Sequence, residues 1–356
     1  MTLLWLNLAI VFAFGFFARY FSTPVLVAGF TNSVRPNSLL VAGAMLMLVL
    51  ISGLRSGIGD TYVYKQIYAS NDFTWKYVLS EKDIGFGVLQ MILKTISDDP
   101  QLLLFTAALI TNVLIIYVLY KHSRMIDISL YVYITGGLFL VSMNGMRQLL
   151  AAAIAFLAIK FLVEGKFKRY VLVIIFASLF HQSALILLPI YFLVKVRAWS
   201  KATLGLLILA VLIVTGYERF TAVLFTAIED TQYADYTTFD EGGASAIRVV
   251  VQAAPLFIAF IGRQRLRQIM PNMDIIINMT LIGLIFMLIS TQNWIFARMA
   301  IYFQLYSLIL ISWLPKIFRE KDQKIIYLGI IVCYFLYYFY ENVISLNIIY
   351  ESDFLK

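Results

Sequence analysis

Charged residues, cysteines and histidines are all scarce in this sequence of 356 residues. Only 13% of the residues are charged, against roughly 25% in an average soluble domain. The single cysteine, Cys333, can form no internal disulfide, which excludes a disulfide-stabilised scaffold. One cysteine and two histidines also provide no cluster with the spacing of metal ligands, and no glycine-rich phosphate loop is present. We therefore expect neither a metal nor a cofactor.

Apolar residues are abundant instead, at 62% of the chain with a mean hydropathy of +0.86. A single soluble core cannot bury so much apolar surface, and at least ten apolar runs approach or exceed the length that crosses a bilayer. We predict an all-α polytopic membrane protein with about 10 to 12 transmembrane helices, forming one integral-membrane domain over residues 1–356. The apolar runs lie near 2–18, 38–54, 101–120, 128–142, 147–163, 168–195, 203–217, 248–262, 273–291, 294–313 and 324–341.

The distribution of basic residues predicts how the chain is oriented in the membrane. With the N-terminus outside, the predicted cytoplasmic segments carry 17 Lys and Arg against 5 Asp and Glu, and the external segments carry 10 against 15. The positive-inside rule therefore explains the net charge of +8, and no nucleic-acid partner is needed. Residues 55–100 and 218–247 form two long external segments. The predicted cytoplasmic segments are 19–37, 121–127, 164–169, 195–201, 263–274 and 316–324.

The apolar run 168–195 is unusual because basic clusters stand at both of its ends. A single crossing would place these clusters on opposite sides of the membrane, whereas two crossings of 14 residues would each span only about 21 Å. We therefore interpret 168–195 as a short helical hairpin or re-entrant pair with His181 near its tip. Irregular backbone at that depth is tolerated where it lines a cavity or is buried in protein.

This topology predicts that many polar residues gather at the external mouth of the protein. Such a convergence is expected of an active site that faces outward. The residues are Arg55, Asp60, Asp83, Asn144, Arg147, Gln148, His181, Gln182, Arg248, Gln292, Asn293 and Arg298. Asn144, Arg147 and Gln148 also follow i, i+3, i+4 spacing, which would place them on one helix face.

Three of the arginines stand near the starts of helices that run from outside to inside. A cation at a helix N-terminus opposes the helix dipole, so Arg147, Arg248 and Arg298 indicate a bound anion such as a diphosphate. The alternative for these three is an arginine that extends to the membrane interface. Arg55 follows a helix that ends outside, where a cation suits the dipole without any ligand.

His181 and Asp60 are the candidate general bases. A titratable group at the tip of a re-entrant segment is a functional candidate, although His181 could also be a satisfied buried histidine that caps the hairpin. Asp60 could be a turn or N-cap residue. Asp83 is a weaker candidate, because EKD could be a solvated charged face.

The order of the polar motifs resembles that of the EpsG-like branch of bacterial polysaccharide polymerases, broadly of the Wzy type. The motifs are RSGIGDTYVYKQIY, DIGFGVLQMI, NGMRQLLAAAIAF and HQSALILLPIYFL, and the resemblance covers roughly residues 50–310. Asp83 departs from the pattern, since we expect Glu in an E-x-G-F motif.

The resemblance implies a membrane glycosyltransferase of the bacterial cytoplasmic membrane with a GT-C-like helical architecture. Its substrates would be oligosaccharide repeat units on an undecaprenyl-diphosphate carrier, joined at the outer leaflet without a metal or a nucleotide sugar. A flippase and a chain-length regulator are the implied protein partners.

The roles expected of the candidate residues follow from this chemistry. Arg147 and Arg298, with Arg55 and Arg248, would bind the diphosphate and stabilise the charge on the leaving group. His181 or Asp60 would take the proton from the attacking hydroxyl. Asn144, Gln148, Gln182 and Asn293 would contact the sugar. The alternatives are a flippase or exporter of lipid-linked oligosaccharides and a sugar O-acyltransferase.

Overall fold

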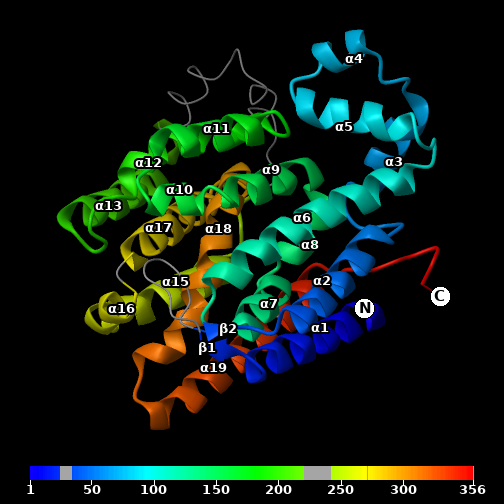
Figure 1. Cartoon of the computed structure of the whole chain (residues 1–356). Helices are drawn as coiled ribbons and strands as arrows, with labels where there is room; N and C mark the ends of the chain where they lie inside the picture. Colours follow the sequence, from blue (N-terminus) through cyan, green and yellow to red (C-terminus); the bar gives the residue numbers. More distant parts are fainter. Residues whose placement is uncertain (25–33, 220–241, 271, 356) are drawn as a thin grey trace. The chain divides into compact units, whose positions relative to one another are not determined.

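The computed structural model describes residues 1–24, 34–219, 242–270 and 272–355 (Figure 1). These residues form two compact units, the first made of Met1–Tyr191 with Ile311–Lys356 and the second of Phe192–Leu310. Helices account for nearly all of the regular structure. A two-stranded antiparallel pair, β1 (Thr23–Pro24) with β2 (Val34–Arg35), is the exception among the described residues.

The first unit is built around the long helix α6. Asp99 begins this helix by accepting a hydrogen bond from the Gln101 N–H at 2.9 Å, with proline in the first turn. Helices α2, α3 and α9 pack on α6, α1 packs between α2 and α7, and α11 packs on α9 (Figure 1). The helices are α1 (Thr2–Tyr20), α2 (Ser38–Gly53), α3 (Thr61–Ser70), α4 (Trp75–Ser80), α5 (Ile84–Lys94), α6 (Pro100–His122), α7 (Ile126–Thr135), α8 (Leu138–Asn144), α9 (Met146–Phe156), α10 (Ile159–Val163), α11 (Phe167–Ser178), η1 (Gln182–Ile186), α12 (Leu187–Leu193), η3 (Leu314–Ile317), α19 (Glu320–Tyr338) and η4 (Phe339–Ser345).

The second unit packs its helices around α17. Helices α13 and α15 lie against α17, and the Asn278 side chain of α17 donates hydrogen bonds to the carbonyls of Val194 and Val196. The helices are α13 (Lys201–Thr215), α15 (Ala246–Ile261), α16 (Arg263–Ile269), α17 (Met273–Ile289) and α18 (Ile295–Trp313), of which α18 continues into the first unit. Most of the predicted external segment 218–247 lies outside the described residues.

The predicted hairpin is present between residues 167 and 193. Helices α11 and α12 run antiparallel, because the Tyr170 hydroxyl donates to the Leu187 carbonyl at 2.9 Å and the Phe167 and Tyr191 rings lie 4.9 Å apart. Each arm is too short to cross about 30 Å of hydrocarbon. His181 lies at the turn between α11 and η1, as predicted.

The all-α polytopic membrane fold is confirmed. Among the described residues, four helical segments are long and apolar enough to cross a membrane, and two bent pairs would raise the number to six. The four are Thr2–Tyr20, Pro100–His122, Ile295–Ile317 and Glu320–Ser345, and the bent pairs are α7 with α8 and α15 with α16. Six further apolar helices have 10–17 residues. The predicted 10 to 12 crossings exceed the number that helix length supports, because several apolar runs are broken or short, and the higher number stays a prediction.

Candidate functional site

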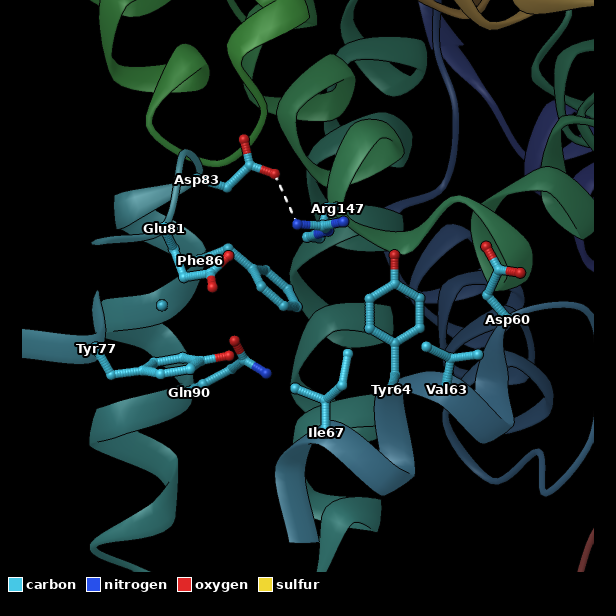
Figure 2. Close-up of a pocket in the computed structure, with 11 residues that line it drawn as sticks. Asp60, Val63, Tyr64, Ile67, Tyr77, Glu81, Asp83, Phe86, Gln90 and Arg147 are labelled. Atoms are coloured by element: carbon cyan, nitrogen blue, oxygen red, sulfur yellow. Dashed lines mark hydrogen bonds and ion pairs between the residues drawn. The ribbon is translucent and has the colours of Figure 1, made fainter. Parts of the chain in front are cut away.

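A cavity of about 390 Å³ opens in the first unit at the end where α6 begins (Figure 2). Its wall combines the aromatic rings of Tyr64, Tyr77 and Phe86 with a guanidinium and three carboxylates. The residues come from α3 and the residue before it, from α4, α5 and the turn between them, and from α9. The lining consists of Asp60, Val63, Tyr64, Ile67, Tyr77, Glu81, Asp83, Phe86, Gly87, Gln90 and Arg147.

An ion pair between Arg147 and Asp83 is the polar centre of this cavity. The Arg147 guanidinium donates a hydrogen bond to Asp83 Oδ2 at 2.9 Å, and the Tyr64 hydroxyl points toward the same guanidinium (Figure 2). The Arg147 side chain keeps 44% of its surface exposed, whereas the Asp83 side chain keeps 6%. A guanidinium has five N–H donors, so Arg147 can bind Asp83 and still offer donors to an anion in the cavity.

Asp83 is buried, which corrects the interpretation of EKD as a solvated face. Glu81 and Lys82 are exposed, but the chain turns the third residue of the run inward, and Asp83 is 5% exposed. Burial raises the pKa of the Asp83 carboxyl, while Arg147 and the backbone N–H of Gln182 oppose that rise. Asp83 is therefore a stronger candidate for the site than its sequence pattern indicates.

His181 and Gln182 bring the hairpin against this ion pair. The backbone N–H of Gln182 donates to Asp83 Oδ1 at 3.2 Å, and His181 Nδ1 lies 3.9 Å from the same oxygen. This second distance is too long for a hydrogen bond but short enough for an ion pair when the imidazole is protonated. Asp83 thus lies between a guanidinium and an imidazole that come from distant parts of the chain.

Gly85 permits this close approach. Its backbone N–H donates to the Leu179 carbonyl at 2.7 Å, which joins the start of α5 to the end of α11. A β-carbon at Gly85 would lie 2.8 Å from Leu179 Cβ and 3.0 Å from the Leu179 carbonyl oxygen. The first glycine in DIGFG, two residues after the acid, is the sequence signal that could have identified Asp83 as a residue at a tight junction.

The break between α8 and α9 gives Asn144, Arg147 and Gln148 separate environments. The chain leaves helical geometry at Gly145, so these three residues do not share one helix face and that prediction is wrong. The exposed Asn144 side chain accepts a hydrogen bond from the Asp60 backbone N–H at 2.9 Å. Gln148 is 5% exposed and does not line the cavity. Of the three residues, Arg147 alone lines the cavity.

The loop before α3 is held by Arg55 rather than left open to solvent. Arg55 is 1% exposed, and its donors are directed to Thr61 Oγ1 at 3.0 Å, to the Ser52 carbonyl and to Met146 Sδ. Burial lowers the pKa of Arg55 to about 10, which leaves it charged at neutral pH. This geometry favours the alternative of a helix-end charge that positions the loop.

The same loop places Asp60 in the cavity wall. Gly59 has φ +51, and a β-carbon there would overlap the Asn144 side chain, so only glycine fits. Asp60 is exposed, and its side chain makes no cap hydrogen bond to α3. The N-cap alternative for its carboxylate is thus unsupported, and Asp60 lines the cavity that contains Arg147.

In the second unit, the segments that carry Arg248, Asn293 and Arg298 lie together. The Ala244 N–H donates to the Ser290 carbonyl at 2.7 Å, and the Trp294 N–H donates to the Gly242 carbonyl at 3.3 Å. The Asn293 side chain accepts from the Ile295 N–H at 3.0 Å, and the Arg298 guanidinium lies 4.5 Å from the Trp294 ring centroid. Arg248 and Arg298 are half-buried near the starts of α15 and α18. Their predicted anion-binding role stays a prediction.

Comparison of the sequence with models of known protein families identifies the family of this chain. The model of the EpsG family matches residues 39–352 of the 356. The chain belongs to the EpsG family. Neither a curated protein nor a solved structure matches it.

Membership in the EpsG family confirms the predicted resemblance and supports a polymerase-like role in polysaccharide synthesis. The family match extends past residue 310 into the C-terminal segment, beyond the range that the motifs indicated. That segment contacts the Arg55 loop, because the Ser56 N–H donates to the Glu351 carbonyl and the Tyr350 hydroxyl donates to the Ile51 carbonyl, both at 2.8 Å. The C-terminal end therefore supports the segment that positions Asp60.

Proposed function

We propose that this EpsG-family protein joins oligosaccharide repeat units carried on undecaprenyl diphosphate, at the outer face of the bacterial cytoplasmic membrane. The observation that supports this proposal most is the cavity in which Arg147 is held by buried Asp83. His181 does not line this cavity but lies beside Asp83. Aromatic rings line the same cavity, and such rings pack well against the apolar faces of sugars. A cation and an adjacent base are what transfer of a glycosyl group from a diphosphate requires.

The reaction exchanges one C–O bond at the anomeric carbon for another and moves one proton to the base. A hydroxyl of the acceptor repeat unit attacks the anomeric carbon of the growing chain, and the bond between that carbon and the diphosphate oxygen breaks. The proton of the hydroxyl passes to the base, and undecaprenyl diphosphate leaves with the bonding electron pair. Arg147 stabilises the negative charge that increases on the leaving diphosphate.

Two residues are candidates for the base. His181 has Nδ1 toward Asp83, an arrangement in which Nε2 accepts the proton and the carboxylate stabilises the imidazolium that forms. Asp60 is an exposed carboxylate in the cavity wall. We favour His181, because an imidazole can exchange a proton near neutral pH and a buried acid stands beside this one.

The other candidate residues take supporting roles in this proposal. Gln182 and Asn144 are exposed near the cavity and orient sugar hydroxyls, whereas buried Gln148 acts through packing. Arg248, Arg298 and Asn293 belong to the second unit, and their contribution is tested by substitution. The mechanism that we propose is independent of metal ions.

The length of the polymer in cells tests the role of Arg147. A host strain without its own copy is given wild type, Arg147→Lys or the control Lys82→Gln, and the polysaccharide is resolved on a gel. Lys82 is an exposed cation beside Asp83 that does not line the cavity. We expect the polymer made by Arg147→Lys to be shorter and at least roughly ten-fold less abundant, since the charge remains but the guanidinium fork is lost. Polymer of wild-type length in that variant would overturn the assignment.

A transporter of lipid-linked oligosaccharides is the second candidate, and one observation favours it. Arg19, Arg124 and Lys316 line a second cavity, beyond the other end of α6. A transporter needs cations that receive a diphosphate on both sides of the membrane in turn. Labelling of an engineered cysteine in the cavity from both sides of the membrane would favour this candidate.

A further inference from the structure

Three predicted cytoplasmic segments meet in a second cavity of the first unit. It has a volume of about 270 Å³ and is lined by Phe16, Arg19, Tyr20, Arg124, Met125 and Lys316. Arg19 lies in the last turn of α1, Arg124 lies in the turn between α6 and α7, and Lys316 lies in η3. Within the described part of the chain, this lining contains three cations and no acid.

The structure holds these cations close together. The Arg124 backbone N–H donates to Ser312 Oγ at 3.1 Å, which ties the turn after α6 to the end of α18. The Lys316 ammonium donates to Gln323 Oε1 at 2.8 Å. Burial, followed by the charge of Arg19, lowers the pKa of Arg124. The backbone of Arg124 and the side chain of Lys316 are thus held where the three charges repel one another, an arrangement that a bound anion would stabilise.

The nearby carboxylates do not fill this role. Asp127 is fully buried behind the lining, where it pairs with Arg19 at 3.2 Å and accepts a hydrogen bond from the Tyr327 hydroxyl at 2.8 Å. Glu320 interacts electrostatically with Lys316 but is exposed and does not line the cavity. Arg124 has no acidic partner among the described side chains. The buried carboxylate of Asp127 therefore pairs with Arg19 and not with the other two cations of the lining.

The position and walls of the cavity indicate the chemistry of its ligand. Helix α6 has 23 residues and spans about 34 Å, so this cavity and the one around Arg147 lie at opposite ends of a membrane-length helix. Phe16 and Tyr20 are exposed beside the cations, together with Phe17 and Phe21. The volume is below the roughly 300–1,000 Å³ of typical small-molecule sites, which suits a phosphate group better than an oligosaccharide.

We propose that Arg19, Arg124 and Lys316 form a binding site for the phosphate of an anionic membrane lipid at the cytoplasmic face. The cations bind the phosphate oxygens, and the acyl chains lie along the exposed aromatic residues at the end of α1. Basic pockets between helices on this side of a membrane are suited to anionic lipid headgroups. The site is separate from the one proposed for polymerisation.

Lipid binding to the delipidated protein in neutral detergent, followed by native mass spectrometry, tests this proposal. The probes are phosphatidylglycerol, phosphatidylcholine and inorganic phosphate, and the variants are Arg124→Gln and Lys316→Gln. Lys121→Gln is the matched control, because Lys121 is an exposed cation of the same predicted cytoplasmic segment that contacts Tyr117 and Tyr120 instead of the cavity.

We expect the dissociation constant for phosphatidylglycerol to rise about five-fold in each of the two cavity variants, with little change in Lys121→Gln. Phosphatidylcholine should bind no differently to any of the four proteins. An unchanged constant in both cavity variants, or an equal rise in Lys121→Gln, would overturn the proposal. Displacement of the lipid by inorganic phosphate at equal concentration would overturn the lipid assignment and give the site to a soluble phosphate compound.

Discussion

At the scale of the residue, one carboxylate connects three segments that are distant in the sequence. Asp83 precedes α5, its Oδ2 accepts from Arg147 of α9, and its Oδ1 accepts from the Gln182 backbone at the start of η1. A buried carboxylate that loses its partner leaves the other charge uncompensated. The arrangement of Arg147 and His181 therefore depends on the charge of Asp83.

We predict that Asp83→Asn lowers the rate of polymerisation at least about ten-fold, because Arg147 loses its fixed anionic partner. The measurement is the rate of polymer formation by purified protein. Asp72→Asn is the control, since Asp72 is exposed between α3 and α4. Equal rates for Asp83→Asn and wild type would contradict a role of the ion pair in the reaction.

Acidification of the wild-type protein provides a second readout of the same residue. Because burial raises the pKa of Asp83, its charge is lost at a pH above the ordinary value of about 4. Acidification has the opposite effect on the stability of the fold. A carboxyl whose pKa is raised in the folded state stabilises the fold below its unfolded-state pKa, and this stabilisation is lost as pH rises through the folded-state pKa. Activity should therefore fall on acidification before the melting temperature does, and a parallel fall would contradict this account.

At the scale of the element, the site depends on how closely α5 approaches α11. Gly85→Ala would place a methyl group against the Leu179 backbone, and such overpacking costs about 1–3 kcal/mol or moves the helices apart. We predict a lower melting temperature and at least about a ten-fold loss of activity. Gly329→Ala is the matched control within a helix, because a β-carbon there meets no atom within 4 Å. A normal rate in Gly85→Ala would show that this contact does not position the site.

Sequence patterns predict some of these elements well. The hairpin is predicted by the length of the apolar run 168–195. Its 28 residues are too few for two full crossings, and the basic clusters at both ends do not fit a single crossing. The apolar helices begin and end close to the predicted runs, since bilayer burial makes hydropathy a strong signal. His181, Arg147 and Asp60 are predicted candidates that the structure brings to one region.

Other features depend on contacts that no local pattern contains. The break at Gly145 separates Asn144 and Gln148 from the face of Arg147, although their spacing fits one helix. Asp83 follows two exposed charged residues, and nothing in this local pattern indicates that it is buried. Its partner in the fold is Arg147, which is 64 positions away in the sequence. The role of Arg55 also depends on the fold. Its guanidinium donates to Thr61 and Met146, which the fold brings close to it, so these donors are directed into the protein.

At the scale of the whole molecule, α6 separates two cavities within the first unit, one with Arg147 among three carboxylates and one with three cations. The Gln101 side chain donates to the Gly53 carbonyl near one cavity, and Arg124 follows the other end of the helix. The predicted orientation places the cavity of Arg147 outside and that of Arg124 inside. This arrangement is a prediction about topology that labelling can test.

We predict that cysteines at the two ends of α6 react from opposite sides of the membrane. In a Cys333→Ser background, Asp60→Cys should react with a membrane-impermeant thiol reagent added to intact cells, and Lys121→Cys should react only after permeabilisation. Both parent side chains are exposed in the structure. Labelling of Asp60→Cys only from inside would reverse the orientation, and labelling from both sides would indicate the alternating access of a transporter.

Polymerisation by the purified protein tests most directly whether the cavity of Arg147 is the active site. The protein in detergent is incubated with the undecaprenyl-diphosphate repeat unit of its host, with and without a chelator, and the products are resolved on a gel. We expect a ladder that persists with the chelator and disappears in Arg147→Ala. A ladder of full length in Arg147→Ala, or movement of the carrier lipid across liposomes with no ladder, would contradict the proposed polymerase.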